Sequence, residues 1–503
     1  MLVHIRGLNS SYEHALFHLF SLFYEQVQLQ FVEKLDGLTQ NATPSLMMDV
    51  HITEDTKVSL TLTTSSGHAR TMKGTYPQSS VYDTSDMKKK EKRTVRLLLL
   101  RLLEAYTGIH QPWGVLTGIR PTKLMHQMRR AGLTKKEIET ELTEVYAVSE
   151  EKISLLSRIM KRQLSVLPDL DTLDRGVSIY IGIPFCPTKC AYCTFPAYAI
   201  NETDGSVASF LEGLHYEMSE TGEWLRTRNI AVTTIYYGGG TPTSITAEEM
   251  DALYAHMYKV FPHADQVREL TVEAGRPDTI TPDKLEVLKK YNVDRMSINP
   301  QSFTNETLEA IGRHHSVEET IEKFQLAKTH GIENINMDLI IGLPGEGIAE
   351  MAHTLGETEK LQPTSLTVHT LSFKRASDMT KNRSKYQVAG REEIKEMMAM
   401  ANEWMTRHHY EPYYLYRQKN ILGNLENVGY ACPDRESLYN IIIMEECQTI
   451  IGLGCGAASK FVKPGTGKIT RYANPKNPRA YRESYKEYTM KKLTLLSETF
   501  DLR

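Results

Sequence analysis

Short apolar runs alternate with amphipathic segments over the middle of the chain. Six of these runs have the length and composition of buried strands: Ser178–Ile183, Thr233–Tyr237, Glu269–Glu273, Arg295–Ile298, Asn334–Ile341 and Ser365–Thr370. Repeated alternation of strands and helices predicts parallel βαβ units. Six units predict an α/β fold with a partial (β/α)6 barrel, whose functional side chains are expected at the carboxyl ends of the strands.

Local helix signals agree with this pattern. Thr246 and Glu249 have the spacing of a capping box, and Pro282 follows Thr281 as the first residue of a helix often does. Two further helices are predicted from apolar stripes: Val207, Phe210, Leu211, Leu214 and Met218, and, in a helix from about Glu392, Ile394, Met397, Met398, Ala401 and Met405. We interpret these methionines as core residues.

The N-terminal part has a different pattern, and residues 94–165 predict several helices. Before them lie a predicted strand, a segment with helical spacing and two alternating segments of a small meander: Val3–Ile5, residues 11–35, Met47–Ile52 and Val58–Thr63. We therefore predict four parts, namely an N-terminal α/β module (1–110), a helical connector (111–172), the partial barrel (173–400) and a mixed C-terminal domain that covers the substrate (401–503).

Composition excludes several classes of protein. The chain has 503 residues, of which 41% are hydrophobic and 24% are charged, and its formal net charge is −3. These values exclude a disordered tail, a collagen-like chain and a histone-like basic protein. The mixed-charge run Asp86–Arg93 predicts a solvated helix start, so we expect no nucleic-acid partner. We see no apolar run of membrane-spanning length and no signal-peptide pattern, and we therefore expect no membrane span and a cytoplasmic location.

Three of the six cysteines, Cys186, Cys190 and Cys193, fall within eight residues directly after the first predicted strand. In a reducing compartment such a group indicates metal binding or catalysis. Three thiolates on a short loop can hold three irons of a cubane cluster and leave the fourth iron open for a ligand. A zinc site with four closed ligands and a set of unliganded thiols are the alternatives. The remaining cysteines are scattered, and we expect Cys432, Cys447 and Cys455 to be buried thiols.

Polar residues follow or end several of the other predicted strands. The segment Tyr237–Thr243 reads YGGGTPT, and its glycines allow backbone amides to approach a charged ligand closely. Four further polar residues are expected at the same edge: Glu273, Gln301, Arg313 and Asp338. Each could be a structural hydrogen bonder, but together they would face one opening of the barrel.

The CxxxCxxC motif after a first strand resembles the radical S-adenosylmethionine (SAM) superfamily. That resemblance implies two cofactors, a [4Fe-4S] cluster and SAM, with Cys186, Cys190 and Cys193 as the cluster ligands. In the superfamily the open iron binds the amino and carboxylate groups of SAM. The reduced cluster cleaves SAM to a 5′-deoxyadenosyl radical, which takes a hydrogen atom from the substrate.

Motif order over about residues 175–460 resembles one branch, the oxygen-independent coproporphyrinogen III oxidase family. The segments Trp113–Lys123 and Ile451–Ser459 resemble parts of the same family. The resemblance implies nine SAM contacts: Tyr180, Tyr192, Gly239, Gly240, Thr241, Glu273, Gln301, Arg313 and Asp338. It implies no catalytic side chain beyond those that hold the cluster and SAM.

The family also implies a function in porphyrin and haem biosynthesis. The expected reaction is the oxidative decarboxylation of two propionates of coproporphyrinogen III, which gives protoporphyrinogen IX, with flavodoxin or ferredoxin as electron donor. Carboxylates of this substrate need cations. The candidates are Arg276, Lys374, Arg375 and Arg417. The tyrosines between Tyr410 and Tyr439 could shape an apolar pocket for the macrocycle or belong to the core.

Two departures from the family motifs keep alternatives open. Phe195 stands where the oxidase branch has a fourth cysteine, a feature shared with the haem-chaperone branch. Lys419–Asn420 stands where the chaperone branch has a histidine that serves haem. The alternative functions are a haem chaperone with a radical SAM core and a radical SAM enzyme that acts on another tetrapyrrole.

Overall fold

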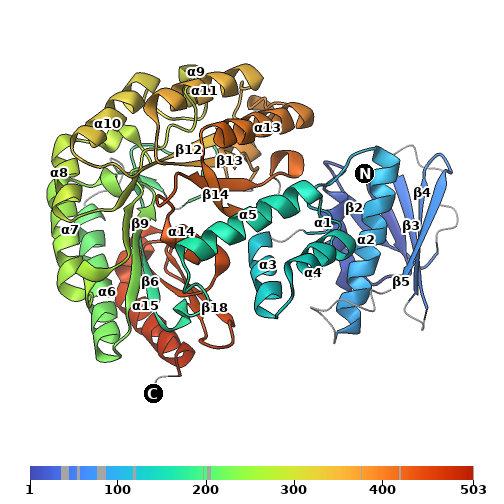
Figure 1. The fold of residues 1–503 in the computed structure, drawn as a ribbon, viewed down its shortest axis with the longest axis horizontal. Helices are drawn as coiled ribbons and strands as arrows, with labels where there is room; N and C mark the ends of the chain where they lie inside the picture. Colours follow the sequence, from blue (N-terminus) through green and yellow to red (C-terminus); the bar gives the residue numbers. More distant parts are fainter. Residues whose placement is uncertain are drawn as a thin grey trace. The chain divides into compact units, whose positions relative to one another are not determined.

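The computed structural model divides into two compact units, Met1–Arg158 and Ile159–Arg503, and each is described by itself (Figure 1). The structure describes residues 1–34, 45–53, 57–75, 86–116, 120–195, 197–200, 206–374, 376–418 and 421–501. Helix α5 (Glu150–Val166) contains the boundary. The division into four parts that the sequence suggests stays a prediction.

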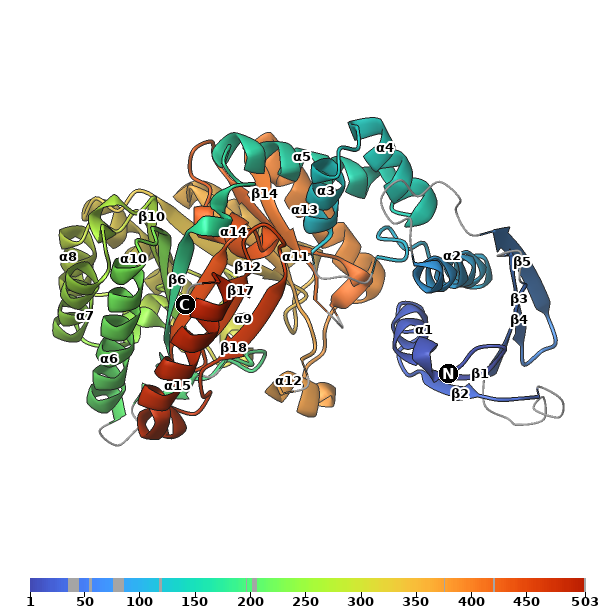
Figure 2. The ribbon, with the colours of Figure 1, turned by 90° about the horizontal axis from the view of Figure 1, so that it is seen from below.

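The first unit is a five-stranded sheet with helices packed on it. Its strands, in spatial order, are β2 (Gln28–Phe31), β1 (Leu2–Arg6), β3 (Ser45–Ile52), β4 (Lys57–Thr64) and β5 (Ala69–Thr75). The last three form the predicted antiparallel meander. Helices α1 (Glu13–Phe20) and α2 (Met87–Thr107) pack on one face of this sheet (Figure 2). After them come α3 (Pro121–Arg130), α4 (Lys135–Thr140) and a π-helical turn, Glu141–Val145.

The predicted helical segment over residues 11–35 is wrong in its second half. Helix α1 ends at Phe20, and Gln28–Phe31 form strand β2, which pairs in parallel with β1. The sequence from Val27 to Phe31 alternates apolar and polar residues, which is the period of a strand. Its apolar residues pack against the core of this unit, whereas its glutamines do not.

The second unit contains an open sheet of eleven strands. Six strands lie side by side in chain order and are parallel: β6 (Val177–Ile183), β9 (Val232–Gly239), β10 (Glu269–Val272), β11 (Arg295–Ser297), β12 (Ile335–Ile341) and β13 (Ser365–Thr370). Antiparallel β15 (Asn427–Ala431) and β14 (Glu411–Tyr416) extend one edge. Parallel β16 (Thr449–Gly454), with β17 (Ala458–Val462) and β18 (Ile469–Ala473), extends the other. The predicted α/β fold with a partial (β/α)6 barrel is confirmed.

Helices follow the strands and cover the outer face of the sheet (Figure 1). They are α6 (Ser206–Thr227), α7 (Ala247–Val260), α8 (Pro282–Lys290), α9 (Asn305–Ala310), α10 (Val317–Thr329), α11 (Ile348–Leu361) and α13 (Arg391–Arg407). The capping box of Thr246 with Glu249 is present, and the methionines of α13 are buried as predicted. Within the described ranges, no helix combines the length and the apolar composition needed to cross a membrane.

A short helix, α14 (Leu438–Glu445), packs against β9 and β14. Its Tyr439 ring stacks on Tyr236 with the ring centroids 4.5 Å apart. The buried Glu269 carboxylate of β10 accepts hydrogen bonds from the backbone N–H groups of Leu438 (2.7 Å) and Tyr439 (3.1 Å) and from the Ser437 hydroxyl (2.9 Å). This carboxylate therefore satisfies the free N–H groups at the start of the helix.

The long C-terminal helix α15 (Pro478–Thr499) packs along α6 and is anchored by a buried ion pair. The side chains of Glu217 on α6 and Lys492 on α15 are both fully buried and form this pair. The Glu217 carboxylate also accepts hydrogen bonds from the Gly454 N–H (2.7 Å), the Asn474 amide (2.7 Å) and the Tyr481 hydroxyl (2.8 Å). One carboxylate thus joins two helices to the end of β16.

We expect Lys492→Met to lower the free energy of unfolding by about 3–5 kcal/mol, because it leaves the Glu217 carboxylate buried without a counter-charge. Urea unfolding followed by circular dichroism measures the change. Lys491→Met is the control, because it removes only an exposed pair with Glu487, and it should leave the unfolding midpoint unchanged. Equal midpoints for the two variants would contradict the role of the buried pair.

Candidate functional site

The three clustered cysteines lie on the loop that follows β6, and all three line one cavity of about 450 Å³. The first, Cys186, ends the short strand β7 (Phe185–Cys186), which pairs with β8 (Tyr198–Ala199). Cys190 and Cys193 follow, and a backbone hydrogen bond of 3.1 Å runs from the Cys193 N–H to the Cys190 carbonyl. The predicted grouping of the thiols at a strand end therefore matches the structure.

Neighbouring segments hold this loop in place. The Thr188 hydroxyl donates to the Gly312 carbonyl (3.0 Å), and the Ala191 N–H donates to the Ile311 carbonyl (2.9 Å). The Ala191 carbonyl accepts from the N–H of Met379 (3.1 Å), which lies in α12 (Asp378–Lys381). The loop is therefore tied to the segment after α9 and to the segment after β13.

The glycine turn at the end of β9 contacts the cysteine loop through its backbone. The Gly240 N–H donates to the Ile183 carbonyl and the Thr241 N–H donates to the Phe185 carbonyl, both at 2.7 Å. A Cβ atom on Gly240 would lie 2.5 Å from the Phe185 oxygen and 3.0 Å from the Cys186 sulfur. Only glycine therefore allows this approach, and the Thr241 hydroxyl lies 3.4 Å from the same sulfur.

Two carboxylates, Glu273 directly after β10 and Asp338 in β12, face the cavity. Burial, followed by the charge of Asp338, raises the pKa of Glu273 to about 8, although the Gly239 N–H and the Tyr236 hydroxyl donate to it. Burial also acts to raise the pKa of Asp338, but hydrogen bonds and the His369 charge outweigh it, so this pKa is lowered. Without a ligand, Asp338 is therefore ionised at neutral pH and Glu273 is largely protonated.

The Asp338 carboxylate belongs to a hydrogen-bonded chain of side chains. It accepts from the Asn336 amide (2.8 Å) and lies 3.5 Å from Nε2 of His369. The other ring nitrogen of His369, Nδ1, lies 3.1 Å from the Tyr416 hydroxyl. Tyr416 therefore orients the His369 ring, and His369 in turn orients the Asp338 carboxylate. Both side chains also line the cavity.

Gln301 and Arg313 are both buried and both line the cavity. Gln301 has a positive φ of 69°, a conformation that a residue with a side chain adopts only at a cost. Its Oε1 atom is buried and has no hydrogen-bond partner among the described residues. The Arg313 guanidinium donates to the carbonyls of Asn299 and Gly275, the latter at 2.9 Å, and it also interacts with Cys190. These two side chains present an acceptor and a cation to the cavity.

The two predicted aromatic contacts occupy different places. Tyr192 lies on the cavity wall beside Cys190, and burial raises the pKa of its hydroxyl. Tyr180 of β6 stacks on Tyr236 with a centroid distance of 6.1 Å, and burial also raises its pKa. Tyr180 lies beneath Gly238 and Glu273 and is absent from the cavity lining. The structure thus places eleven of the twelve predicted site residues on the cavity: Cys186, Cys190, Cys193, Tyr192, Gly239, Gly240, Thr241, Glu273, Gln301, Arg313 and Asp338.

Several predicted substrate contacts are engaged elsewhere. Arg276 is buried and paired with Asp278 at 2.9 Å, and it also donates to Thr188, although it reaches the cavity. Arg417 is buried and donates to the Asn424 side chain at 2.6 Å. Arg375 and Lys419–Asn420 lie outside the described residues. Of the four cation candidates, Lys374 is therefore the one whose side chain lines the cavity without a described ionic partner.

The tyrosines between Tyr410 and Tyr439 divide between the cavity and the core. Tyr416 alone among them lines the cavity, whereas Tyr413, Tyr414 and Tyr439 pack in a core cluster with Ile441 and Ile442. Of the two interpretations that the sequence left open, the structure supports the core for these three tyrosines, where α14 packs against β9 and β14. Among the scattered cysteines, Cys447 and Cys455 are buried as predicted, and Cys432 is partly exposed.

Sequence reasoning missed several polar residues of the cavity, which include Asn299, His369, Ser372 and Gln418. Asn299 accepts a hydrogen bond from the Asp338 N–H (3.2 Å) and also receives the Arg313 guanidinium. It stands two residues before Gln301, so the same strand-end argument could have found it. His369 could have been found as a polar residue inside the apolar run of β13.

The residues present fit an iron–sulfur cluster and SAM. Three thiols line one cavity together with Gly239, Gly240 and Thr241 of the glycine turn, and the buried Gln301 Oε1 lacks a partner among the described residues. Among the described residues, no three His, Cys, Asp or Glu side chains converge on one point as the ligands of a single ion do. A cubane requires no such convergence, because each thiolate binds a different iron. Burial raises the pKa of Cys186 to about 11, and bound iron would deprotonate it.

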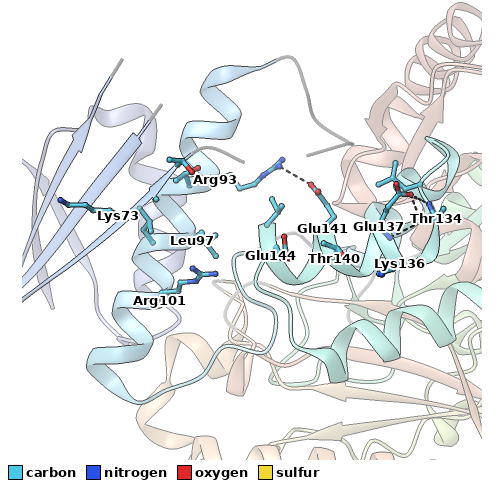
Figure 3. Close-up of a pocket in the computed structure, with 16 residues that line it drawn as sticks. Lys73, Arg93, Leu97, Arg101, Thr134, Lys136, Glu137, Thr140, Glu141 and Glu144 are labelled. Atoms are coloured by element: carbon cyan, nitrogen blue, oxygen red, sulfur yellow. Dashed lines mark hydrogen bonds and ion pairs between the residues drawn. The ribbon is translucent and has the colours of Figure 1, made fainter. Parts of the chain in front are cut away.

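A larger cavity, of about 540 Å³, lies within the first unit and contains none of the predicted site residues. Figure 3 shows Arg93, Leu97 and Arg101 of α2 on one side of it and Glu141 and Glu144 of the π-helical turn on the other. One ion pair that joins the two sides is that of Arg93 and Glu141, which are 3.8 Å apart. The lining is a mixture of opposite charges and leucine side chains, with no group suited to cluster chemistry.

Comparison with known proteins decides the family. Residues 180–357 match the model of the radical SAM superfamily. The chain is 56% identical over 509 residues to the oxygen-independent coproporphyrinogen-III oxidase-like protein HemZ of Bacillus subtilis (strain 168), which covers 100% of this chain and 99% of that protein. The chain belongs to this family of radical SAM proteins. Its cofactors are those of the superfamily, a [4Fe-4S] cluster and SAM, as the sequence predicted.

Two further similarities are less extensive. The haem chaperone HemW of B. subtilis is 36% identical over 194 residues, which cover 39% of this chain and 50% of that protein. A solved structure of coproporphyrinogen III oxidase (HemN) from Escherichia coli matches with a TM-score of 0.51 and 20% identity, and it covers 65% of this chain and 73% of that one. The second similarity shows the fold alone. Relatives thus carry the names of an oxidase and of a chaperone.

We expect Cys186→Ala, Cys190→Ala and Cys193→Ala each to abolish a four-iron cluster and SAM cleavage, because three thiolates must hold three irons. Iron and sulfide content after anaerobic reconstitution, together with 5′-deoxyadenosine by mass spectrometry, measures both effects. Cys432→Ala should retain both, since Cys432 lies outside the cavity. SAM cleavage by the triple variant would contradict the assignment.

The raised pKa of Glu273 gives a pH dependence for SAM binding. A cationic ligand favours the ionised carboxylate, so binding below the pKa of about 8 must release a proton. We expect the affinity of the unreduced, cluster-containing protein for SAM to rise with pH by up to about tenfold per unit until the pH passes that pKa. Calorimetry at several pH values measures it. Glu273→Gln should lose this rise, and identical pH profiles for the two proteins would contradict the contact.

Proposed function

We propose that the chain is a radical SAM oxidoreductase of porphyrin biosynthesis that converts coproporphyrinogen III to protoporphyrinogen IX without oxygen. The observation that carries this proposal is the composition of one cavity. It combines the three cysteines, the polar groups suited to SAM, several apolar side chains and Lys374. The sequence similarity, over the full length of this chain, to a protein named as oxidase-like supports the same reaction.

Each group of residues has a separate task in this reaction. Cys186, Cys190 and Cys193 would hold the cluster. When bound, the cluster and SAM supply a carbon-centred radical that takes a hydrogen atom. The buried Arg313 guanidinium suits the SAM carboxylate, and Gln301 and Glu273 suit its hydroxyl and amino groups. Since these side chains are buried or bonded to the backbone, they are oriented before the ligand arrives.

The chemistry balances as two identical half-reactions on one substrate. A propionate side chain, –CH2–CH2–COO⁻, loses a hydrogen atom from the carbon attached to the pyrrole. Loss of CO2 then forms the vinyl double bond and releases one electron to a one-electron acceptor. The protein must keep the carbon radical away from water and from its own side chains until the electron leaves. We propose flavodoxin or ferredoxin as the source of the electron that reduces the cluster.

A haem chaperone is the second candidate function. It is favoured by Phe195, which lines the cavity with 57% of its surface exposed and stands where the oxidase branch has a cysteine. An exposed aromatic ring beside the cluster loop would suit contact with a flat macrocycle. The similarity to HemW over 39% of the chain points the same way.

Anaerobic turnover separates these candidates. We expect the reconstituted protein, given dithionite, SAM and coproporphyrinogen III, to form 5′-deoxyadenosine and two products that have lost one and two units of CO2 plus hydrogen. Mass spectrometry measures all three, and the Cys193→Ala protein is the control. Stoichiometric haem binding without decarboxylated product would contradict the oxidase and favour the chaperone. Methylated or ring-opened tetrapyrroles would favour another tetrapyrrole enzyme.

A further inference from the structure

Four cationic side chains line the cysteine cavity, and three of them have identified tasks or lie at its margin. Arg276 is paired with Asp278, and Arg313 is bonded to two backbone carbonyls. Lys189 is exposed on the cysteine loop itself. The fourth cation, Lys374, lies four residues after the end of β13, on the segment that closes the cavity.

Lys374 is partly buried, and within the described ranges its ammonium makes no hydrogen bond and no ion pair. Burial lowers its pKa, and the sulfur of Cys193 is the group that acts in the opposite direction. The backbone around it is fixed, since the Lys374 carbonyl accepts from the N–H (2.9 Å) and the hydroxyl (2.8 Å) of Ser377. A fixed, partly desolvated cation without a counter-charge favours an anionic ligand.

Apolar side chains also line this cavity, beside polar residues such as His369 and Ser372. Leu371 precedes Lys374, and Ile340, Tyr416 and Met444 reach the same cavity from β12, β14 and α14. Leu371 and Ile340 are buried, and Met444 is a flexible side chain that adapts to irregular ligands. These four side chains, Ile340, Leu371, Tyr416 and Met444, are therefore suited to contact the body of a macrocycle in the cavity that Lys374 also lines.

We propose that Lys374 binds a propionate carboxylate of the substrate and so restricts the substrate to an apolar macrocycle that carries flexible carboxylates. This inference rests on the proposed function for the identity of the reaction. A carboxylate held by Lys374 would lie beside the thiol of Cys193, which places the adjoining side-chain carbons near the cluster loop. Lys374 is thus a substrate-binding residue, and the cysteine loop and the lysine together would choose which side chain reacts.

Binding to the unreduced protein tests this role without any turnover. The probe is fluorescent coproporphyrin III, which carries four carboxylates, and its tetramethyl ester is the neutral comparison. We expect Lys374→Met to weaken binding of the free acid by about ten- to hundredfold, the range for a hydrogen bond to a charged group, and to leave the ester unaffected. Lys374→Arg should restore most of the affinity. Lys381→Met, on α12, is the matched control and should change nothing.

Two results would overturn the inference. In the first, the free acid binds Lys374→Met as tightly as it binds wild type. In the second, Lys374→Met loses the cluster or shifts the reduction potential of the cluster, while the KM for the substrate stays the same. The latter would make the lysine a counter-charge of Cys193 alone. In turnover we expect a raised KM with unchanged SAM cleavage in the absence of substrate. If wild type binds the free acid through Lys374 but yields no decarboxylated product, the proposed reaction fails and the carboxylate site stands.

Discussion

The site depends on two backbone hydrogen bonds that join neighbouring strand ends. The Gly240 and Thr241 N–H groups donate to the carbonyls of Ile183 and Phe185, directly before Cys186. They can form only because position 240 has no Cβ, which would collide with the Phe185 oxygen and the Cys186 sulfur. The first cluster ligand is thereby fixed relative to β9, and the parallel register of the strands brings the other polar strand ends to the same edge.

Cationic and anionic side chains lie at different places around this edge of the sheet, and each group suits a different ligand. Two of the thiols have a buried arginine near them: Arg276 beside Cys186 and Arg313 beside Cys190. Thiolates that bind a cluster carry negative charge, so these cations offset it and influence the potential of the cluster. On the other side, Glu273 and Asp338 hold one negative charge between them at neutral pH, which suits a ligand with a positive centre. The cavity therefore offers cations to the thiolates and carboxylates to a ligand with a positive centre.

Strands and their order were accessible from the sequence because each buried parallel strand is a short apolar run between helical segments. The same strand-end rule located Glu273, Gln301, Arg313 and Asp338, although their contact with SAM stays a prediction. The rule does not find side chains that reach the cavity from elements other than the parallel strands and the segments after them. Met444 comes from α14 and Tyr416 from an antiparallel strand, and no local spacing connects either to the cysteines. The tyrosine-rich segment left two interpretations open, because a composition suited to a pocket equally suits a core. Residues 25–31 misled the interpretation, since helical spacing in α1 continues into a short strand of period two.

The central claim is that the cysteine loop holds a cluster whose open iron binds SAM within this cavity. Electron paramagnetic resonance of the reduced, reconstituted protein with SAM labelled with ¹⁵N in its amino group and ¹⁷O in its carboxylate tests it directly. We expect a [4Fe-4S] signal that changes on adding SAM and shows magnetic coupling to both labels. A signal that does not respond to SAM, or one without coupling to either label, would contradict it.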